Sequence, residues 1–166
     1  MNKSVLILTG AKGSGKTYIG TLIQEKLNVE FFRVEEVWLR IKEERISDEY
    51  IRKGFSLVEE EIDKKMVNTD NLIIESTAAH EYFNTFLKSI RKKYNINLIK
   101  VVASPEVCAE RIKSRDQIRH IPVSDDIIEE INIKSFAVDL PFNLVIDNNN
   151  TADNKIVEIF RLFFNL

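Results

Sequence analysis

Residues 4–27 read SVLILTGAKGSGKTYIGTLIQEKL, and the octapeptide GAKGSGKT at residues 10–17 decides the fold. An apolar run at residues 5–8 precedes the octapeptide, and an amphipathic pattern at residues 18–27 follows it. The octapeptide matches G-x-x-x-x-G-K-[ST], a spacing in which several backbone N–H groups can point into one concavity. The stretch therefore predicts a phosphate-binding loop between a buried strand and a helix.

The residue types of this loop predict separate roles in binding a nucleoside triphosphate. The positive end of the following helix favours an anion next to the loop. Lys16 would reach the β- and γ-phosphates, and the hydroxyl of Thr17 would hold Mg²⁺. The loop residues that we expect to bind the nucleotide are Gly10, Lys12, Gly13, Ser14, Gly15, Lys16 and Thr17.

Length and composition indicate one globular domain over residues 1–166, with 44% hydrophobic and 30% charged residues. The net charge of −2 provides no global basic field for nucleic acid or an anionic membrane. The single cysteine, Cys108, excludes an internal disulfide framework and a cysteine-based metal cluster. The first apolar run is too short for a signal-peptide core or a membrane span, so we expect a cytoplasmic protein without a membrane partner.

Runs rich in β-forming residues alternate with helical patterns along the chain. The predicted strands cover residues 5–8, 30–34, 71–74, 96–103 and 143–146. The predicted helices cover residues 18–27, 37–42, 48–66, 81–94, 106–115, 125–136 and 151–164. This alternation, with strands that are apolar on both faces, predicts a parallel sheet covered by helices on each side.

Acidic residues follow two of the predicted strands. Glu75 closes the run at residues 71–74, where a carboxylate can support the Mg²⁺ shell; the alternative is an ordinary acidic residue leaving a strand. Glu35 and Glu36 follow the second strand, where one carboxylate could act on the acceptor of a phosphoryl group. We prefer Glu36 for this role, although both residues also suit the start of a helix.

Arginines recur every four residues at Arg111, Arg115 and Arg119. A helix that continued through them would place all three on one face. Guanidinium groups gathered in this way neutralise the charge that moves during phosphoryl transfer, which favours a catalytic role for Arg111 and Arg115. The alternative is a solvated helix face on which Glu110 and Asp116 are ion-pair partners.

Taken with the loop, these segments resemble the P-loop kinases of the nucleoside monophosphate kinase superfamily, closest to the small polynucleotide-kinase-like and adenylate-kinase-like branch. The segment ERIKSR at residues 110–115 looks like the family's entry into a mobile lid, and IESTA at residues 74–78 is similar to its third strand tip. The segment RHIPV at residues 119–123 and the triplet WLR at residues 38–40 resemble the branch's second lid segment and acceptor-side helix.

The resemblance implies a three-layer α/β/α P-loop NTPase fold with a five-stranded parallel sheet. It also implies a short arginine-bearing lid at about residues 111–124 and an acceptor-side helical region at about residues 36–69. The donor would be ATP with Mg²⁺, held through Thr17 and Glu75. By the same resemblance, Arg111 would pack on the adenine, Arg115 would meet the phosphates, and Asn148 would lie in the loop beside the adenine.

On the acceptor side, the resemblance implies binding by Glu35, Glu36, Arg40, Thr77 and Arg119. Glutamate stands at both acidic positions where the family usually has aspartate, and the Asp-Gly-x-Pro-Arg segment of adenylate-type enzymes is missing after the third strand. We therefore expect transfer of the γ-phosphoryl group to a nucleoside, nucleotide or related metabolite other than the adenylate-type acceptor.

Two alternatives stay open at this point. A polynucleotide 5′-hydroxyl kinase would need a basic groove, for which Lys42, Arg45, Arg52 and Lys53 provide material beside acidic neighbours. A P-loop NTPase or switch that acts through a partner is the other alternative, although an arginine-bearing lid that excludes water favours transfer over hydrolysis. Oligomeric state does not follow from these patterns.

Overall fold

A computed structural model describes residues 3–41, 47–114 and 123–164. The strands are β1 (Ser4–Thr9), β2 (Glu30–Phe32), β3 (Asn71–Ser76), β4 (Asn95–Val102) and β5 (Leu144–Asp147). The helices are α1 (Lys16–Leu27), α2 (Glu35–Trp38), α3 (Asp48–Lys65), α4 (Tyr82–Ile90), α5 (Pro105–Ser114), α6 (Asp125–Phe136) and α7 (Asp153–Phe164).

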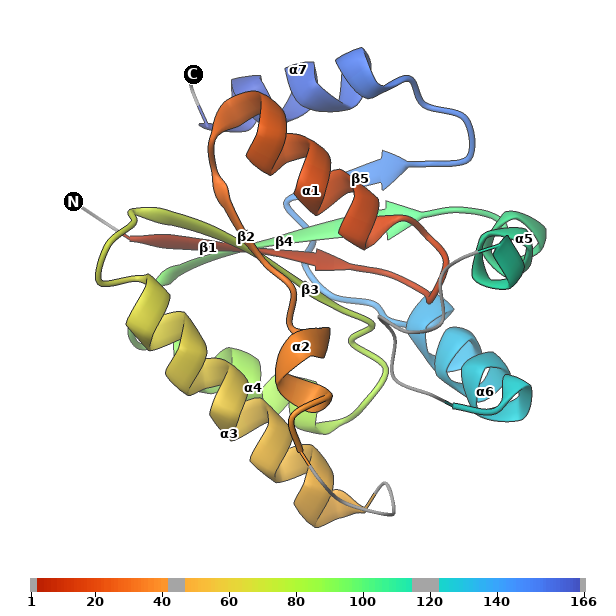
Figure 1. The fold of residues 1–166 in the computed structure, drawn as a ribbon, viewed down its shortest axis with the longest axis horizontal. Coiled ribbons are helices and arrows are strands. Elements are labelled where there is room, and N and C mark those ends of the chain that lie inside the picture. Colours follow the sequence, from red (N-terminus) through yellow and green to blue (C-terminus); the bar gives the residue numbers. More distant parts are fainter. Residues whose placement is uncertain (1–2, 42–46, 115–122, 165–166) are drawn as a thin grey trace.

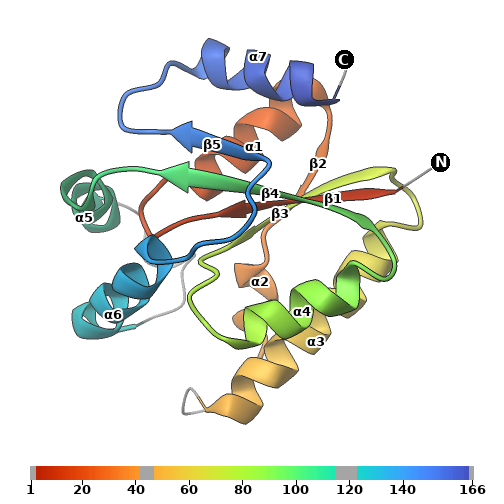
Figure 2. The same cartoon turned by 180° about the vertical axis from the view of Figure 1, so that it is seen from behind.

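The strands form one five-stranded parallel sheet in the order β2-β3-β1-β4-β5 (Figure 1). The strand that precedes the phosphate-binding loop is therefore central, with β3 and β4 as its neighbours. Figures 1 and 2 show α1 and α7 on one face of the sheet and α3 and α4 on the other. The predicted three-layer α/β/α fold is confirmed.

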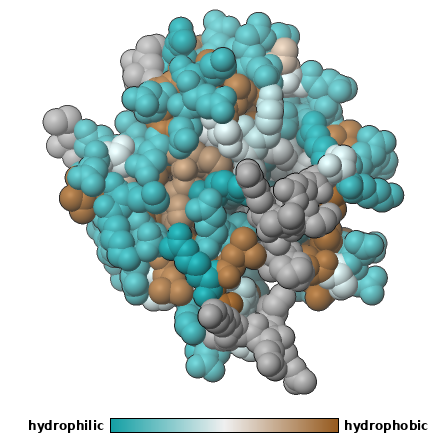
Figure 3. Space-filling model, in the orientation of Figure 1, coloured by the Kyte–Doolittle hydropathy of each residue, from teal (hydrophilic) through white to brown (hydrophobic). Residues whose placement is uncertain are grey.

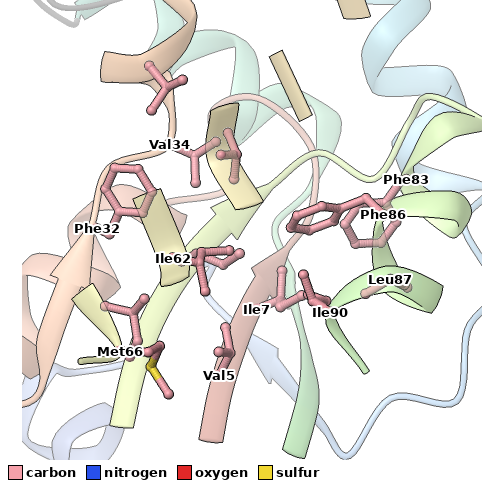
Figure 4. Packing of buried hydrophobic residues seen from close by; sticks show 14 of the residues in the cluster. Val5, Ile7, Phe32, Val34, Ile62, Met66, Phe83, Phe86, Leu87 and Ile90 are labelled. Atoms are coloured by element: carbon pink, nitrogen blue, oxygen red, sulfur yellow. The ribbon is translucent and has the colours of Figure 1, made fainter. Parts of the chain in front are cut away.

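Side chains of β1 alternate between two hydrophobic cores, one on each face of the sheet. Val5 and Ile7 pack with α3 and α4 in the first core, which Figure 4 shows from close by. Leu6 and Leu8 pack with α1 and α7 in the second core. All four are fully buried, so each contributes on the order of 1.5–3 kcal/mol of hydrophobic stabilisation. Burial on both faces explains why this strand is apolar without alternation.

The region after β2 differs from its prediction. The strand ends at Phe32 instead of residue 34, and the helix predicted at residues 37–42 begins earlier, at Glu35, and ends at Trp38. Val34, the N-cap of α2, already has helical φ and ψ, which accounts for the early start. Both glutamates of this segment consequently belong to the first helical turn, and their side chains leave the helix in different directions.

The carboxyl ends of the strands meet at one edge of the sheet, where α5 and α6 also lie (Figure 1). Register pairs Leu8 of β1 with Glu75 of β3, so the carboxylate stands beside the start of the phosphate-binding loop. Hydrophilic residues dominate the face shown in Figure 3, with apolar residues in smaller patches. Among the described helices, none has the length and apolar composition needed to cross a membrane.

Candidate active site

The GAKGSGKT loop joins β1 to α1 and borders a cavity of about 950 Å³. Gly10, Gly13 and Gly15 have φ values of 148°, 86° and 97°, a region that residues with a Cβ rarely adopt. At Gly15 a Cβ would also lie 2.2 Å from Nδ2 of Asn148, so a side chain there would have to displace the Asn148 amide. The backbone conformation predicted for a phosphate cradle is present.

Lys16 is buried at the first position of α1. Its Nζ donates hydrogen bonds to the carbonyl oxygens of Gly10 and Ala11, at 2.7 and 2.8 Å, so the ammonium is held inside the loop. Burial lowers the pKa of Lys16 to about 8, although the nearby Glu75 carboxylate opposes this shift. A bound polyphosphate would supply the negative charge that favours the ammonium form.

Thr17 and Glu75 form the second polar pair of the site. The Thr17 hydroxyl donates to Oε2 of Glu75 at 2.6 Å, and the other carboxylate oxygen, Oε1, is buried without a hydrogen-bond partner among the described residues. Burial raises the pKa of Glu75, against the opposing effects of Lys16 and of the Thr17 hydrogen bond. A buried carboxylate with one unused oxygen is a costly arrangement unless a cation completes it.

This pair fits a magnesium ion. Mg²⁺ prefers oxygen ligands and usually takes one or two from the protein, with the remainder from water and substrate phosphates. A hydroxyl and a carboxylate oxygen stand together here, and the described residues contain no group of three or more His, Cys, Asp or Glu side chains suited to a metal. Two protein oxygens would leave the other positions around Mg²⁺ to water and nucleotide phosphates.

Arg111 of α5 and Asn148, which follows β5, both contact the phosphate-binding loop. The Arg111 guanidinium donates to the Ser14 carbonyl at 3.3 Å and to the Asn148 carbonyl at 2.8 Å. The buried Asn148 side chain donates to the same Ser14 carbonyl at 2.8 Å. Packing of Arg111 on an adenine stays a prediction. Arg115 and Arg119 lie outside the described residues, as does most of the predicted lid.

Helix α6 contributes two contacts that sequence reasoning missed. The Asn132 side chain accepts from the Lys12 backbone N–H at 2.7 Å and donates to the Lys12 carbonyl at 3.1 Å. One turn later, the Ser135 hydroxyl donates to the Thr77 carbonyl at 2.7 Å. This helix therefore bridges the phosphate-binding loop and the end of β3. The available signal was a pair of polar residues three apart in the isoleucine-rich sequence DDIIEEINIKSF.

On the acceptor side, the structure separates Glu35 from Glu36. Glu35 and Thr77 line the cavity, and Glu35 is close enough to influence the pKa values of Lys16 and Glu75. Glu36 is exposed and is not a lining residue. The geometry therefore corrects the preference for Glu36, because α2 turns Glu35 and Trp38, three residues apart, toward the cavity.

Arg40 is also outside the cavity lining, and its side chain is exposed. It lies four residues after Glu36, on the solvent side of this segment, and its charge acts on Glu61 of α3. The cavity wall near α2 is instead aromatic: the lining includes Trp38, Tyr50, Phe55 and Phe86. Phe55 follows the helical spacing of apolar residues in α3, which is typical of a core residue and gives no sign of a cavity.

Comparison with known proteins places this geometry in a family. Residues 6–132 match the family model described as AAA domain. The chain belongs to this family. The matched range runs from β1 through the phosphate-binding loop, Glu75 and Arg111 to Asn132 in α6, so it contains most of the residues that border the site.

Relatives of this AAA domain protein include kinases with different acceptors in their names. A cytidylate kinase of Saccharolobus islandicus is 26% identical, over 98% of this chain and 91% of the relative. A shikimate kinase of Caldicellulosiruptor saccharolyticus is also 26% identical, over 82% of this chain and 79% of the relative. The crystal structure of a sugar kinase from Janibacter sp. has a TM-score of 0.70 at 16% identity, covering 99% of this chain and 95% of that one. The resemblance to small P-loop kinases is confirmed.

Proposed function

We propose that the protein is an ATP-dependent kinase that transfers the γ-phosphoryl group to a small acceptor, a nucleoside, nucleotide or related metabolite. One observation carries the proposal: the cavity of about 950 Å³ that the phosphate-binding loop borders is also lined by side chains of α2, α3, α4 and the end of β3, and we call this side its acceptor half. Hydrolysis needs room only for water beside the γ-phosphate, whereas transfer needs a second binding site next to it. Kinases among the relatives and structural neighbours support this choice.

The donor half would bind ATP through charge and backbone groups. Lys16 and Arg111 neutralise the phosphates, and the loop N–H groups together with the N-terminus of α1 hold them in place. Thr17 and Glu75 would hold Mg²⁺, which would reduce the charge that an incoming oxygen meets. Arg115, Arg119 and the lid at about residues 111–124 stay predictions within this proposal.

The acceptor half would present an oxygen nucleophile to the γ-phosphorus. A new bond forms between this oxygen and phosphorus while the bond to the β–γ bridging oxygen breaks, and ADP leaves with that electron pair. Glu35 is the carboxylate that we propose to orient the acceptor and to take its proton, since it lines the cavity and is close enough to Lys16 to influence its pKa. Thr77 lies at the strand tip beside this position.

The test is a transfer assay with γ-labelled ATP against nucleosides, nucleoside 5′-monophosphates, shikimate, gluconate and a 5′-hydroxyl oligonucleotide. We expect label on one of the small acceptors. Label on the oligonucleotide alone would favour the polynucleotide kinase alternative. Label that appears only as free phosphate with every acceptor would contradict the kinase proposal and favour an NTPase that acts through a partner.

A further inference from the structure

The acceptor half of the cavity has an aromatic wall whose geometry is fixed by packing. The Trp38 ring lies 5.5 Å from the Tyr50 ring at 47° and 5.5 Å from the Phe55 ring at 88°. Phe55 in turn lies 5.2 Å from Phe86 of α4. All four side chains line the cavity, and such tilted and edge-on contacts hold each ring in one orientation.

Gly54 makes room for the tryptophan. A Cβ at residue 54 would lie 1.9 Å from Cζ3 of Trp38 and 2.2 Å from its Cη2, so the indole rests directly on the backbone of α3. An alanine at this position would have to displace either the ring or the helix. The indole is therefore seated at a defined place in the wall, with only part of its surface buried.

The remaining lining of this half divides into an apolar part and a polar part. Val34, Ile51, Val58 and Ile74 line it together with the rings. The polar residues are Glu75, Ser76 and Thr77 at the end of β3, His80 after it, and Glu35 at the start of α2. A polyol seated against the apolar part would lose hydrogen bonds to water without replacement, at a cost of roughly 1–3 kcal/mol for each buried hydroxyl. A planar aromatic ring can instead pack its faces, which carry no hydroxyl groups, against the apolar part while its polar edge groups stay near the strand tips or water.

We infer that the acceptor carries a planar aromatic ring, such as a nucleobase, and that Trp38 is the residue that selects it. This inference rests on the proposed kinase function. The ring packs against the indole in the apolar part of the acceptor half, and the oxygen that receives the phosphoryl group lies at the polar strand tips. The group that Trp38 would recognise is the base, and a nucleoside and a nucleoside 5′-monophosphate both carry one.

Trp38 also offers a direct measure of binding, because it is the single tryptophan of the chain. Tryptophan fluorescence would be titrated with cytidine, cytidine 5′-monophosphate, shikimate and gluconate, each with ADP already present. We expect saturable quenching by cytidine or its monophosphate, the two arms distinguishing nucleoside from nucleotide. Quenching by shikimate or gluconate with none from either base-containing compound would overturn the inference.

Variants test the same residue by turnover. Trp38→Leu keeps an apolar side chain but removes the ring, so the KM for the base-containing acceptor should rise about tenfold while the KM for ATP stays unchanged. Trp38→Phe keeps a ring, so its KM for the base-containing acceptor should lie within about threefold of the value for the unmodified protein. Leu162→Ala, at a residue of α7 that is 74% exposed, is the control and should change neither KM.

The failures of the inference and of the proposed function are distinguishable. Transfer of label to shikimate or gluconate in preference to base-containing compounds would leave the kinase function standing and refute the selection by Trp38. An unchanged acceptor KM in folded Trp38→Leu protein would refute it as well. If Trp38→Leu fails to fold, two measurements still test the role of Trp38. They are the fluorescence titration of the unmodified protein and the acceptor KM of Trp38→Phe. Absence of transfer to every acceptor would refute the proposed function itself.

Discussion

The Asn132 side chain pairs with both backbone polar groups of Lys12, accepting at 2.7 Å and donating at 3.1 Å. A residue of α6 thereby holds the phosphate-binding loop, although 120 positions separate the two residues in the chain. The same helix reaches the end of β3 through Ser135 and Thr77. Helix α6 is therefore attached to both the donor half and the acceptor half of the cavity.

Replacement of Asn132 by alanine should loosen the loop. Two hydrogen bonds disappear, so we expect the free energy of unfolding to fall by about 1–2 kcal/mol and ATP to bind less tightly. Chemical denaturation and calorimetric titration with ATP would measure the two effects. Asn84→Ala, at an exposed position of α4, is the matched control and should leave both values unchanged. Equal behaviour of the two variants would contradict a role for Asn132 in holding the loop.

Lys16→Ala should abolish turnover. The change removes the ammonium that is to neutralise the transferred phosphoryl group, so kcat should fall by at least about 100-fold. Lys16 Nζ donates hydrogen bonds only to loop carbonyls among the described residues, so the variant should still fold. Its circular-dichroism spectrum should match that of the unmodified protein. Lys88→Ala, at an exposed position of α4, should keep full activity. Normal turnover of folded Lys16→Ala protein would exclude the proposed phosphate cradle.

Glu75→Gln should separate stability from metal dependence. The glutamine oxygen can still accept from Thr17 while the buried charge is removed, so metal-free protein should be as stable as the unmodified chain or more stable. Stabilisation by ATP with Mg²⁺, measured as a shift in Tm, should shrink, and so should transfer activity. The shift with ATP and EDTA serves as the reference. An undiminished effect of Mg²⁺ in the variant would remove Glu75 from the metal site.

Hydrogen bonds from the segment after α4 to Asp63 of α3, which we call the Asp63 clamp, predict a dependence of stability on pH. Asp63 accepts from Lys93 at 2.6 Å and from Tyr94 at 2.7 Å. Partial burial alone would raise the pKa of Asp63, but these two hydrogen bonds outweigh it and lower the pKa below its ordinary value of 3.8. Because the pKa of Asp63 is lower in the folded than in the unfolded protein, the clamp adds fully to the free energy of unfolding above pH 3.8. This stabilisation is lost as the pH falls through the pKa of Asp63 in the folded protein.

Asp63→Asn should therefore be less stable at neutral pH and should lose less stability on acidification. Partly exposed ion pairs contribute little, so the neutral-pH difference should be at most about 1 kcal/mol. Urea denaturation between pH 2 and 7 measures both quantities, with Asp125→Asn, at an exposed residue of α6, as the control. Parallel pH curves for Asp63→Asn and the unmodified protein would show that the clamp is not the source of the dependence.

The donor half was predictable because it depends on local features. Glycines at fixed spacing produce the loop conformation, and the strand before it and the helix after it have clear periodic patterns. Glu75 followed from its place at the end of an apolar strand. The parallel sheet then brings it beside Thr17 with no further information, since the register of β1 and β3 sets their separation.

The acceptor half was less predictable because it depends on helix phase and on distant contacts. A two-residue shift in the start of α2 decided between Glu35 and Glu36. Phe55 lies at an apolar position of the helical repeat in α3. A ring that is buried only in the core and a ring that also borders a cavity give the same sequence pattern. The partners of Asn132 and Ser135 lie 120 and 58 residues away, and no local pattern encodes such separations.

The aromatic wall has a consequence for how this protein can change. Trp38, Phe55, Val58 and Phe86 border the acceptor half and also pack within the core between the sheet, α3 and α4. The polar side chains of the donor half, Lys16, Thr17, Glu75, Arg111 and Asn148, are by contrast not members of the hydrophobic cores. Substitution of the residues that line the acceptor half instead disturbs the hydrophobic core between the sheet, α3 and α4. A library that aims at new acceptors should therefore begin from a thermostabilised parent, whose reserve of stability absorbs the damage.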